Sequence, residues 1–281
     1  MIRVELVKLV RRPRNWVSIA LLCGLPVTVA IFVAVTHVAP PPGQGPTLLS
    51  AVLSSGSLFP AAALAIVLPI FLPIAVAVVA GDSIAGEANS GMLRYLLARP
   101  VRRTRLLIAK LVALVAYVLL AVILVALTSY LTGQLLFGSA PVAVTQSGIT
   151  TSNVAANSLS GTGLTPFEVL TRTAGAVAFI AVSMLGVGAI ALFLSTVTDS
   201  SLGAALGALA VLIASEVLVV LNSAAAVSPY LPTRYWLSWI DFFRQPILWQ
   251  DIDRGFAIQG VYVLVFLGAA WANFASKDIT S

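Results

Sequence analysis

Charged residues are scarce in this chain of 281 residues, because Asp, Glu, Lys and Arg together make up only 9% of it. A soluble domain normally contains about 25%. Hydrophobic residues make up 59%, and the mean hydropathy is +1.03. A globular fold of this size has no interior large enough to hide so much apolar surface, which excludes soluble enzymes and nucleic-acid-binding modules. The sequence therefore predicts a protein of the lipid bilayer, with no nucleic acid among its partners.

Residues suited to redox, metal and nucleotide chemistry are also scarce. The chain has one cysteine, Cys23, and one histidine, His37, so no disulfide can form within it and no metal site is expected. It contains no GxxxxGK[ST] phosphate loop, no HExxH and no GxSxG sequence. We therefore expect no catalytic residue and no cofactor bound by this chain. If ATP drives its function, another polypeptide binds the nucleotide.

Long uncharged runs predict six membrane spans. About 20 apolar residues in a helix cross the roughly 30 Å of hydrocarbon, and a helix pairs its own backbone amides. The period-2 alternation of a membrane barrel is absent, so we expect an all-α, polytopic fold with one transmembrane domain, residues 1–281. Its predicted segments are a cytoplasmic interfacial helix (1–15), span 1 (16–38), span 2 (59–80), a cytoplasmic coupling loop (81–105), span 3 (106–131), an outer loop (138–165), span 4 (173–195), span 5 (202–221), an outer interfacial element (230–254) and span 6 (255–275).

The basic residues predict the orientation of the chain. Eleven of the 16 lie in residues 1–15 and 94–110, and the loops after spans 1 and 3 contain none. Positive loops remain in the cytoplasm, so both stretches are expected there. An even number of spans returns the carboxyl terminus to the same side. The prediction is a multi-pass protein of the cell membrane with both termini cytoplasmic.

Two flanking segments are expected to lie in the membrane interface. In residues 1–12, Ile2, Leu6, Leu9 and Val10 fall on one arc of a helix, which is typical of a short interfacial helix. A simple cationic flank that only sets topology is the alternative. Residues 230–254 contain three of the five tryptophans, and this enrichment favours an anchoring role in the outer interface over a substrate site.

The loop between spans 2 and 3 has a distinctive pattern. Apolar residues recur at helical spacing from Ile84 to Leu96, and Pro100 disfavours helix at Arg99. An amphipathic helix, a proline break, a basic cluster and a membrane helix therefore follow one another. This order resembles the permease subunits of type-2 ABC transporters (the ABC-2 type permease family), and the residues that carry the resemblance are Glu87, Gly91, Leu96, Leu97, Pro100, Arg103 and Lys110.

The resemblance implies that this segment is a coupling helix, which docks into a separate ABC ATP-binding subunit. On that basis Glu87 would contact the ATPase or the amino-terminal helix, and Gly91, Arg94, Pro100 and Arg103 would belong to the ATPase-coupling region. It also implies a second permease subunit, identical or different, with ATP and magnesium held on the partner ATPase. The alternative for the arginines is that they only enforce topology and bind membrane lipids.

Several residues inside the predicted spans suit moving helices. Pro69 and Pro73 are expected to bend span 2, and Gly203 and Gly207 form a GxxxG spacing in span 5. Glu216 is the one acid well within a predicted span, where a charge is costly unless it meets a cavity or a partner. We expect it to face the interior, where it could line the translocation path, touch Arg172 or Ser183 of span 4, or mark a proton-coupled site.

The resemblance to type-2 ABC permeases implies that the chain is the permease subunit of an ATP-driven exporter, a transport subunit and not an enzyme. Apolar spans with few polar residues favour a hydrophobic or amphipathic substrate such as a drug, a peptide or a lipid. Two alternatives stay open. An ion-gradient-driven secondary transporter normally has several buried ionisable residues and often an internal repeat. A non-transporting membrane assembly protein would show no dependence on a substrate.

Overall fold

The computed structural model describes residues 1–36, 56–89, 103–138, 144–146, 149–151, 156–160, 163–221 and 226–276. It is mostly helical (85%). Five of its helices are long and apolar enough to cross a membrane, and a bent pair of helices makes a sixth if it is counted as one span. The chain is therefore a multi-pass membrane protein, as its composition predicts, and its described residues contain five or six candidate spans.

The amino terminus forms two helices in succession. Helix α1 (Ile2–Arg11) buries Leu9, and Arg12 after it is extended. Helix α2 (Pro13–Thr36) then begins with a proline at its first position, where the missing N–H costs nothing. The amphipathic helix predicted in residues 1–15 is present and separate from the first span.

The second span is broken, and the bend predicted from its prolines is confirmed. A short 3₁₀ helix, η1 (Gly56–Leu58), leads into α4 (Phe59–Val67), and α5 (Phe71–Gly81) follows at an angle of 59°. Pro69 lies in the break and Pro73 in the first turn of α5, so neither can supply the backbone N–H that a continuous helix needs.

Two helices follow the second span on either side of residues that lie outside the described part of the chain. Helix α6 (Ala85–Asn89) has only five residues. Helix α8 (Arg103–Phe137) has 35 residues and passes the predicted ends of span 3 on both sides. Charge-free runs locate the hydrocarbon crossing, but a helix continues into the interface as long as nothing breaks it.

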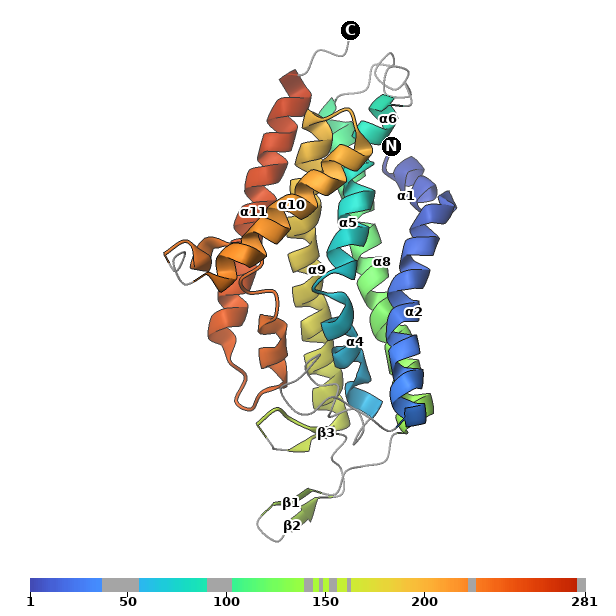
Figure 1. Cartoon of the computed structure of the whole chain (residues 1–281), viewed down its shortest axis with the longest axis vertical. Coiled ribbons are helices and arrows are strands. Elements are labelled where there is room, and N and C mark those ends of the chain that lie inside the picture. Colours follow the sequence, from blue (N-terminus) through green and yellow to red (C-terminus); the bar gives the residue numbers. More distant parts are fainter. Residues whose placement is uncertain are drawn as a thin grey trace.

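The predicted outer loop contains short strands, an exception to the all-α prediction. Strands β1 (Val144–Gln146) and β2 (Ile149–Thr151) pair antiparallel, and so do β3 (Ala156–Asn157) and β4 (Gly163–Leu164). They are two or three residues long and lie at the end of the bundle opposite α6 (Figure 1).

Helix α9 (Pro166–Val197) begins seven residues before the predicted span 4. The Thr165 side chain accepts from the Glu168 backbone N–H while the Glu168 carboxylate accepts from the Thr165 backbone N–H, and together they form a capping box. Helix α10 (Ser201–Val220) follows after a short turn, and its first turn is capped by Ser200.

The last part of the chain corresponds to the predicted outer interfacial element and span 6. It contains the 3₁₀ helices η3 (Ser228–Tyr230) and η4 (Ser238–Phe243) and then α11 (Trp249–Ser276). Helix α11 therefore begins within the stretch predicted as the outer element. In η4, Trp239 and Phe243 are almost fully buried, so this segment packs on the protein.

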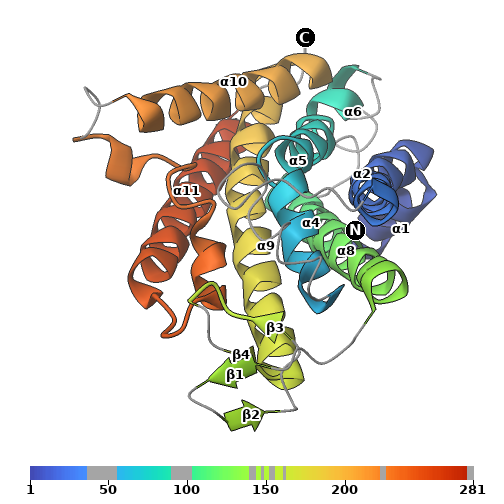
Figure 2. The same ribbon diagram turned by 60° about the horizontal axis from the view of Figure 1, so that its bottom comes forward.

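Helix α9 lies at the centre of the bundle, and 67% of its most apolar stretch is buried. Helix α11 packs on one side of it and α4, α5 and α8 on the other, with α2 and α1 beyond α8 (Figure 2). Helices α8 and α9 approach closely at Gly188, where an added Cβ would lie 2.8 Å from the Leu114 side chain. Helix α10 crosses the others obliquely (Figures 1 and 2).

Helices α1 and α6, the start of α8 and the end of α11 share one end of the bundle (Figure 1). The amino-terminal helix and the last described helix thus end on the same side. This is the arrangement that an even number of crossings produces. The candidate site lies at this end.

Candidate functional site

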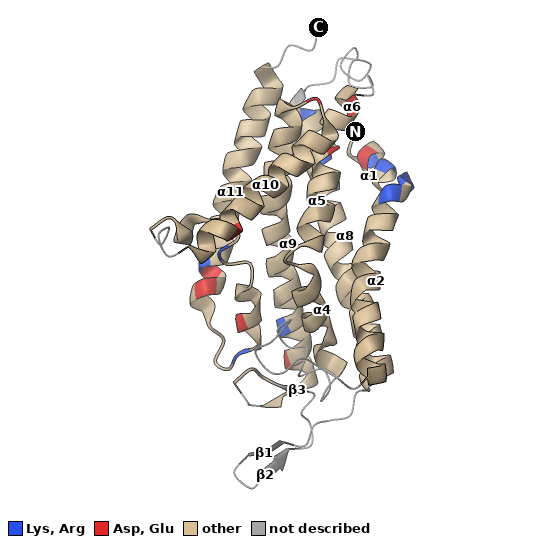
Figure 3. Ribbon diagram, viewed as in Figure 1, with Lys and Arg blue, Asp and Glu red and all other residues tan. Residues whose placement is uncertain are grey.

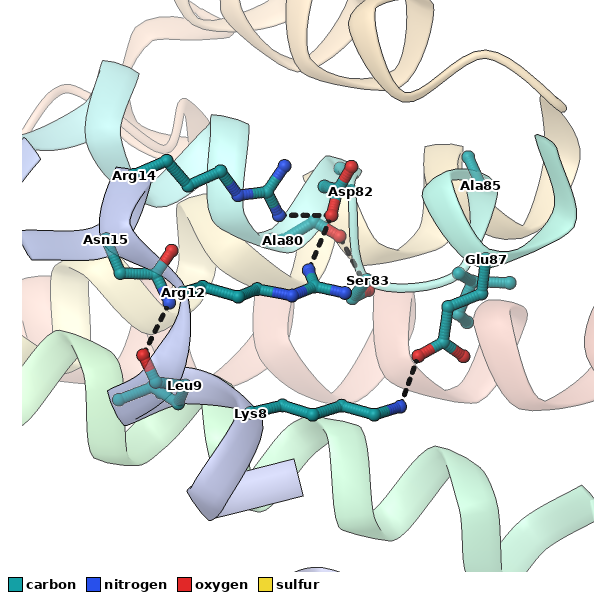
Figure 4. A network of polar contacts seen from close by, with 12 residues as sticks. Lys8, Leu9, Arg12, Arg14, Asn15, Ala80, Asp82, Ser83, Ala85 and Glu87 are labelled. Atoms are coloured by element: carbon teal, nitrogen blue, oxygen red, sulfur yellow. Dashed lines mark hydrogen bonds and ion pairs between the residues drawn. The ribbon is translucent and has the colours of Figure 1, made fainter. Parts of the chain in front are cut away.

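A network of oppositely charged side chains joins α1, α2, α6 and α8 at this end of the bundle. Figure 3 shows how the charges gather near the two ends of the long helices and leave the middle largely uncharged. Figure 4 shows part of the network from close by, with the contacts of Arg12 and Arg14 with Asp82 and of Lys8 with Glu87. The members of the network are three acids, Glu5, Asp82 and Glu87, and four bases, Lys8, Arg12, Arg14 and Lys110.

Glu87 is the centre of the network and exposes only 3% of its surface. Its Oε2 lies 2.7 Å from the Nζ of Lys110, which is also 3% exposed. Its Oε1 accepts a hydrogen bond from Lys8 Nζ at 2.9 Å, and Lys8 also bonds Glu5 at 3.1 Å. One carboxylate on α6 therefore connects the amino-terminal helix with the first turns of α8.

Asp82, at the end of α5, holds the junction between α1 and α2. Arg12 Nη1 donates to Asp82 Oδ2 at 2.8 Å, and Arg14 contacts the same oxygen. Both arginines are more exposed than Lys110. The basic amino terminus is thus tied to the end of the second span by Asp82 and to α6 by Glu87.

Backbone contacts fix the turn between α5 and α6 to the central helix. The Ser195 hydroxyl of α9 accepts from the backbone N–H groups of Ile84 at 3.1 Å and Ala85 at 2.9 Å, and donates to Gly81 O at 2.7 Å. Lys110 also donates to the Ser83 carbonyl. Since Ser195 is only 1% exposed, α6 is attached to the protein interior and not only to surface charges.

A small cavity of about 50 Å³ lies within the network, between α1, α2, α5, α6 and α8. Asn15 lines it and is 4% exposed. Its Nδ2 donates to Leu9 O at 2.9 Å, whereas its Oδ1 has no partner among the described residues. A cavity of this size with polar walls accommodates one or two water molecules.

The charged groups shift one another's pKa in the directions expected of ion pairs. Burial alone would raise the pKa of Glu87, but Lys110 and Lys8 outweigh it and lower the pKa below its usual value. Burial alone would lower the pKa of Lys8, but hydrogen bonds and attraction from Glu87 and Glu5 raise it. Both groups are therefore charged at neutral pH.

The residues predicted for ATPase coupling are only partly described. Glu87 lies in the network and contacts the amino-terminal helix, which is one of the two partners expected for it. Gly91, Arg94 and Pro100 lie outside the described residues. Arg103 begins α8, and its side chain is also outside the description.

Glu216 lies on an exposed face of α10 in this single chain, so it does not face the interior of its own bundle. Thr233 is the polar side chain beside it. The two partners suggested for it bond elsewhere, because Arg172 donates to the carbonyls of Phe242 and Arg244, and Ser183 donates to Phe179 O.

Sequence reasoning missed most of the network, although two signals were available. Lys110 lies inside a hydrophobic run, where a charge normally needs a partner. Asp82 and Glu87 are the first acids after a long uncharged run. Their negative charges could pair with the basic residues of the amino terminus. Ser195 gave no such signal, since serines are common in this chain.

Comparison with known proteins gives a family and no function. No curated protein matches the chain. A family model described as "Protein of unknown function (DUF2705)" matches residues 50–280, which is well over half of the chain. The match includes Asp82, Glu87 and Lys110 and begins after α2. The chain therefore belongs to the family of proteins of unknown function named DUF2705.

Proposed function

We propose that this chain is the permease subunit of an ATP-driven exporter of the type-2 ABC class. It works with a second permease subunit and with a separate ATP-binding subunit that hydrolyses ATP. Both of its termini lie in the cytoplasm of the cell that carries it in its plasma membrane. The substrate is a hydrophobic or amphipathic compound.

One observation carries this proposal: the segment after the second span is clamped to three other elements. Glu87 joins α6 to α1 and α8, and Ser195 joins the turn before α6 to α9. A docking segment can move membrane helices only if it is firmly attached to them. An unattached loop would absorb the force as local bending.

The bent second span and the oblique helix α10 are the elements that a movement of α6 would displace. Helix α5 packs against both α9 and α10, so a displacement of α6 reaches the centre of the bundle through α5. Because the span is broken between α4 and α5, α4 can stay packed on α8 while α5 moves. ATP drives such a change only if the nucleotide-bound ATPase prefers one of the two arrangements.

The proposal is tested by purifying the chain in mild detergent from the cells that carry it and identifying any ATP-binding subunit that co-purifies. We expect a stable complex that hydrolyses ATP faster in the presence of its transported compound. Glu87→Gln should uncouple hydrolysis from the compound, whereas Asp253→Asn, an equal charge change on the exposed start of α11, should not.

Two outcomes would refute the proposal. One is that no ATP-binding subunit co-purifies under any mild detergent condition. The other is transport that persists after ATP depletion and collapses with the ion gradient, which identifies a secondary transporter. A chain that shows no dependence on substrate in either assay is a membrane assembly protein.

A further inference from the structure

A groove of about 730 Å³ opens at the side of the bundle, far from the charge network. It lies between the end of α10, residues 228–238 and the first turns of α11. Its volume is within the range typical of sites for small organic ligands. The groove is not part of the mechanism proposed above.

The groove carries an excess of positive charge. Arg234 and Arg254 line it together with one acid, Asp251. Arg254 lies 3.9 Å from Asp251, with more than half of each side chain exposed, and no described acid lies within 4 Å of Arg234. Two guanidinium groups that are weakly paired or unpaired can hold an anion by charge-assisted hydrogen bonds.

The remaining walls combine hydroxyl groups with apolar surface. Ser228, Tyr235 and Ser238 bring hydroxyl groups to the groove. Val219 and Ile258, from the two flanking membrane helices, bring aliphatic side chains. A ligand that fits both parts has an anionic end and an apolar end.

The surroundings place the groove at the boundary of the membrane. It lies where the apolar helix α10 ends and α11 begins. Tyr230 in its wall is 69% exposed, and Trp249, two residues before Asp251 in the chain, is 54% exposed; exposed Tyr and Trp are enriched at the depth of lipid headgroups. The Tyr262 hydroxyl of α11 donates to Tyr230 O, which ties this rim to the helix.

We propose that the groove binds the phosphate headgroup of an anionic phospholipid. Arg234 and Arg254 contact the phosphate, the hydroxyl groups donate further hydrogen bonds to its oxygens, and one acyl chain follows the surface between α10 and α11. This proposal depends only on the groove's location and charge, and so it does not depend on whether ATP drives the protein.

The experiment uses the purified full chain in a mild non-ionic detergent. Phosphatidylglycerol, phosphatidylcholine or inorganic phosphate is added, and bound lipid is counted by native mass spectrometry at increasing salt. We expect phosphatidylglycerol to bind at least about tenfold more tightly than phosphatidylcholine, and inorganic phosphate at equal concentration not to compete with it.

The variants separate this groove from other basic surfaces. The double variant Arg234→Gln, Arg254→Gln should weaken binding about 25-fold, since each arginine contributes about fivefold near a lipid surface. Asp251→Asn removes the competing acid and should tighten binding a few-fold. Arg244→Gln is the matched control, because Arg244 pairs with Asp241 and does not line the groove, and it should leave binding unchanged.

Three results would overturn the proposal. Equal affinities for phosphatidylglycerol and phosphatidylcholine would show that the groove does not select lipids by their net negative charge. Displacement of phosphatidylglycerol by inorganic phosphate would identify a site for the free anion. An unchanged affinity in the double arginine variant, with an unchanged melting temperature to show that it folds, would place the lipid elsewhere.

Discussion

The Lys110 ammonium lies 2.7 Å from Glu87 Oε2, and each of the two residues exposes only 3% of its surface. Lys8 contacts the other oxygen of the same carboxylate. A buried ion pair contributes little compared with good apolar packing, but loss of one partner leaves the other charge buried and unpaired. Substituting Glu87 or Lys110 alone should therefore lower the stability of the protein much more than replacing both by apolar residues.

Glu87→Gln should lower the stability of the purified protein by about 3–5 kcal/mol, because it leaves the Lys110 charge buried with a hydrogen bond to the Ser83 carbonyl and the more distant Glu5 carboxylate, at 3.8 Å, as its ion-pair partner. The measurement is thermal unfolding in detergent followed by intrinsic fluorescence. Asp253→Asn, at an exposed position, should change stability by less than about 1 kcal/mol. The double variant Glu87→Leu, Lys110→Met should recover most of the loss, and a double variant as unstable as Glu87→Gln would contradict this account.

Stability should depend on pH through the same groups, with opposite signs at the two ends of the range. The lowered pKa of Glu87 means that its contribution is complete above the ordinary value of 4.5 and is lost as the pH falls through the folded value. The raised pKa of Lys8 means that its contribution is complete below 10.5 and is lost as the pH rises through the folded value.

The difference in melting temperature between wild type and Glu87→Gln should therefore be constant from about pH 5 to pH 10 and shrink below that window. Melting curves of both proteins across the range provide the measurement. A difference that grows on acidification would mean that Glu87 is not ionised in the folded protein.

Ser195→Ala should detach the turn before α6 from the central helix. The substitution leaves the N–H groups of Ile84 and Ala85 without their acceptor in a buried place, at a cost of about 1–3 kcal/mol each. Hydrogen exchange of these two amides should speed up strongly. Ser276→Ala is the control, because Ser276 is exposed and bonds only to carbonyls of its own helix; equal exchange in both variants would show that Ser195 does not hold the turn.

Much of the fold follows from the sequence because the bilayer imposes one simple requirement. An uncharged run of sufficient length must be a helix, so the crossings can be located without knowledge of tertiary contacts. The break in the second span also follows from local chemistry, since Pro69 and Pro73 remove backbone donors. Helix ends are less predictable, although the Thr165–Glu168 capping box at the start of α9 is a local signal.

The site is less predictable because its partners are distant in the sequence. Lys8 and Glu87 are 79 positions apart, and nothing local selects one base for one acid. The sequence indicates only that Lys110 needs some partner. Glu216 lies on an exposed face of α10, whereas the sequence predicts that it faces the interior. An acid within an apolar run indicates that the residue lies in a membrane helix, but it does not indicate which face of that helix carries it.

Gly133→Ala tests the packing of the bent span against α8 and should lower stability by about 1–3 kcal/mol. An added Cβ would lie 2.7 Å from the Phe59 Cβ and also meet the backbone of Gly56, so two elements would have to separate. Gly24→Ala in α2 is the matched control, because a Cβ there meets nothing within 4 Å and alanine favours helix. Thermal unfolding of the two variants in the same detergent gives the comparison. If Gly133→Ala is as stable as Gly24→Ala, the close approach of α8 to η1 and α4 does not hold the second span in place.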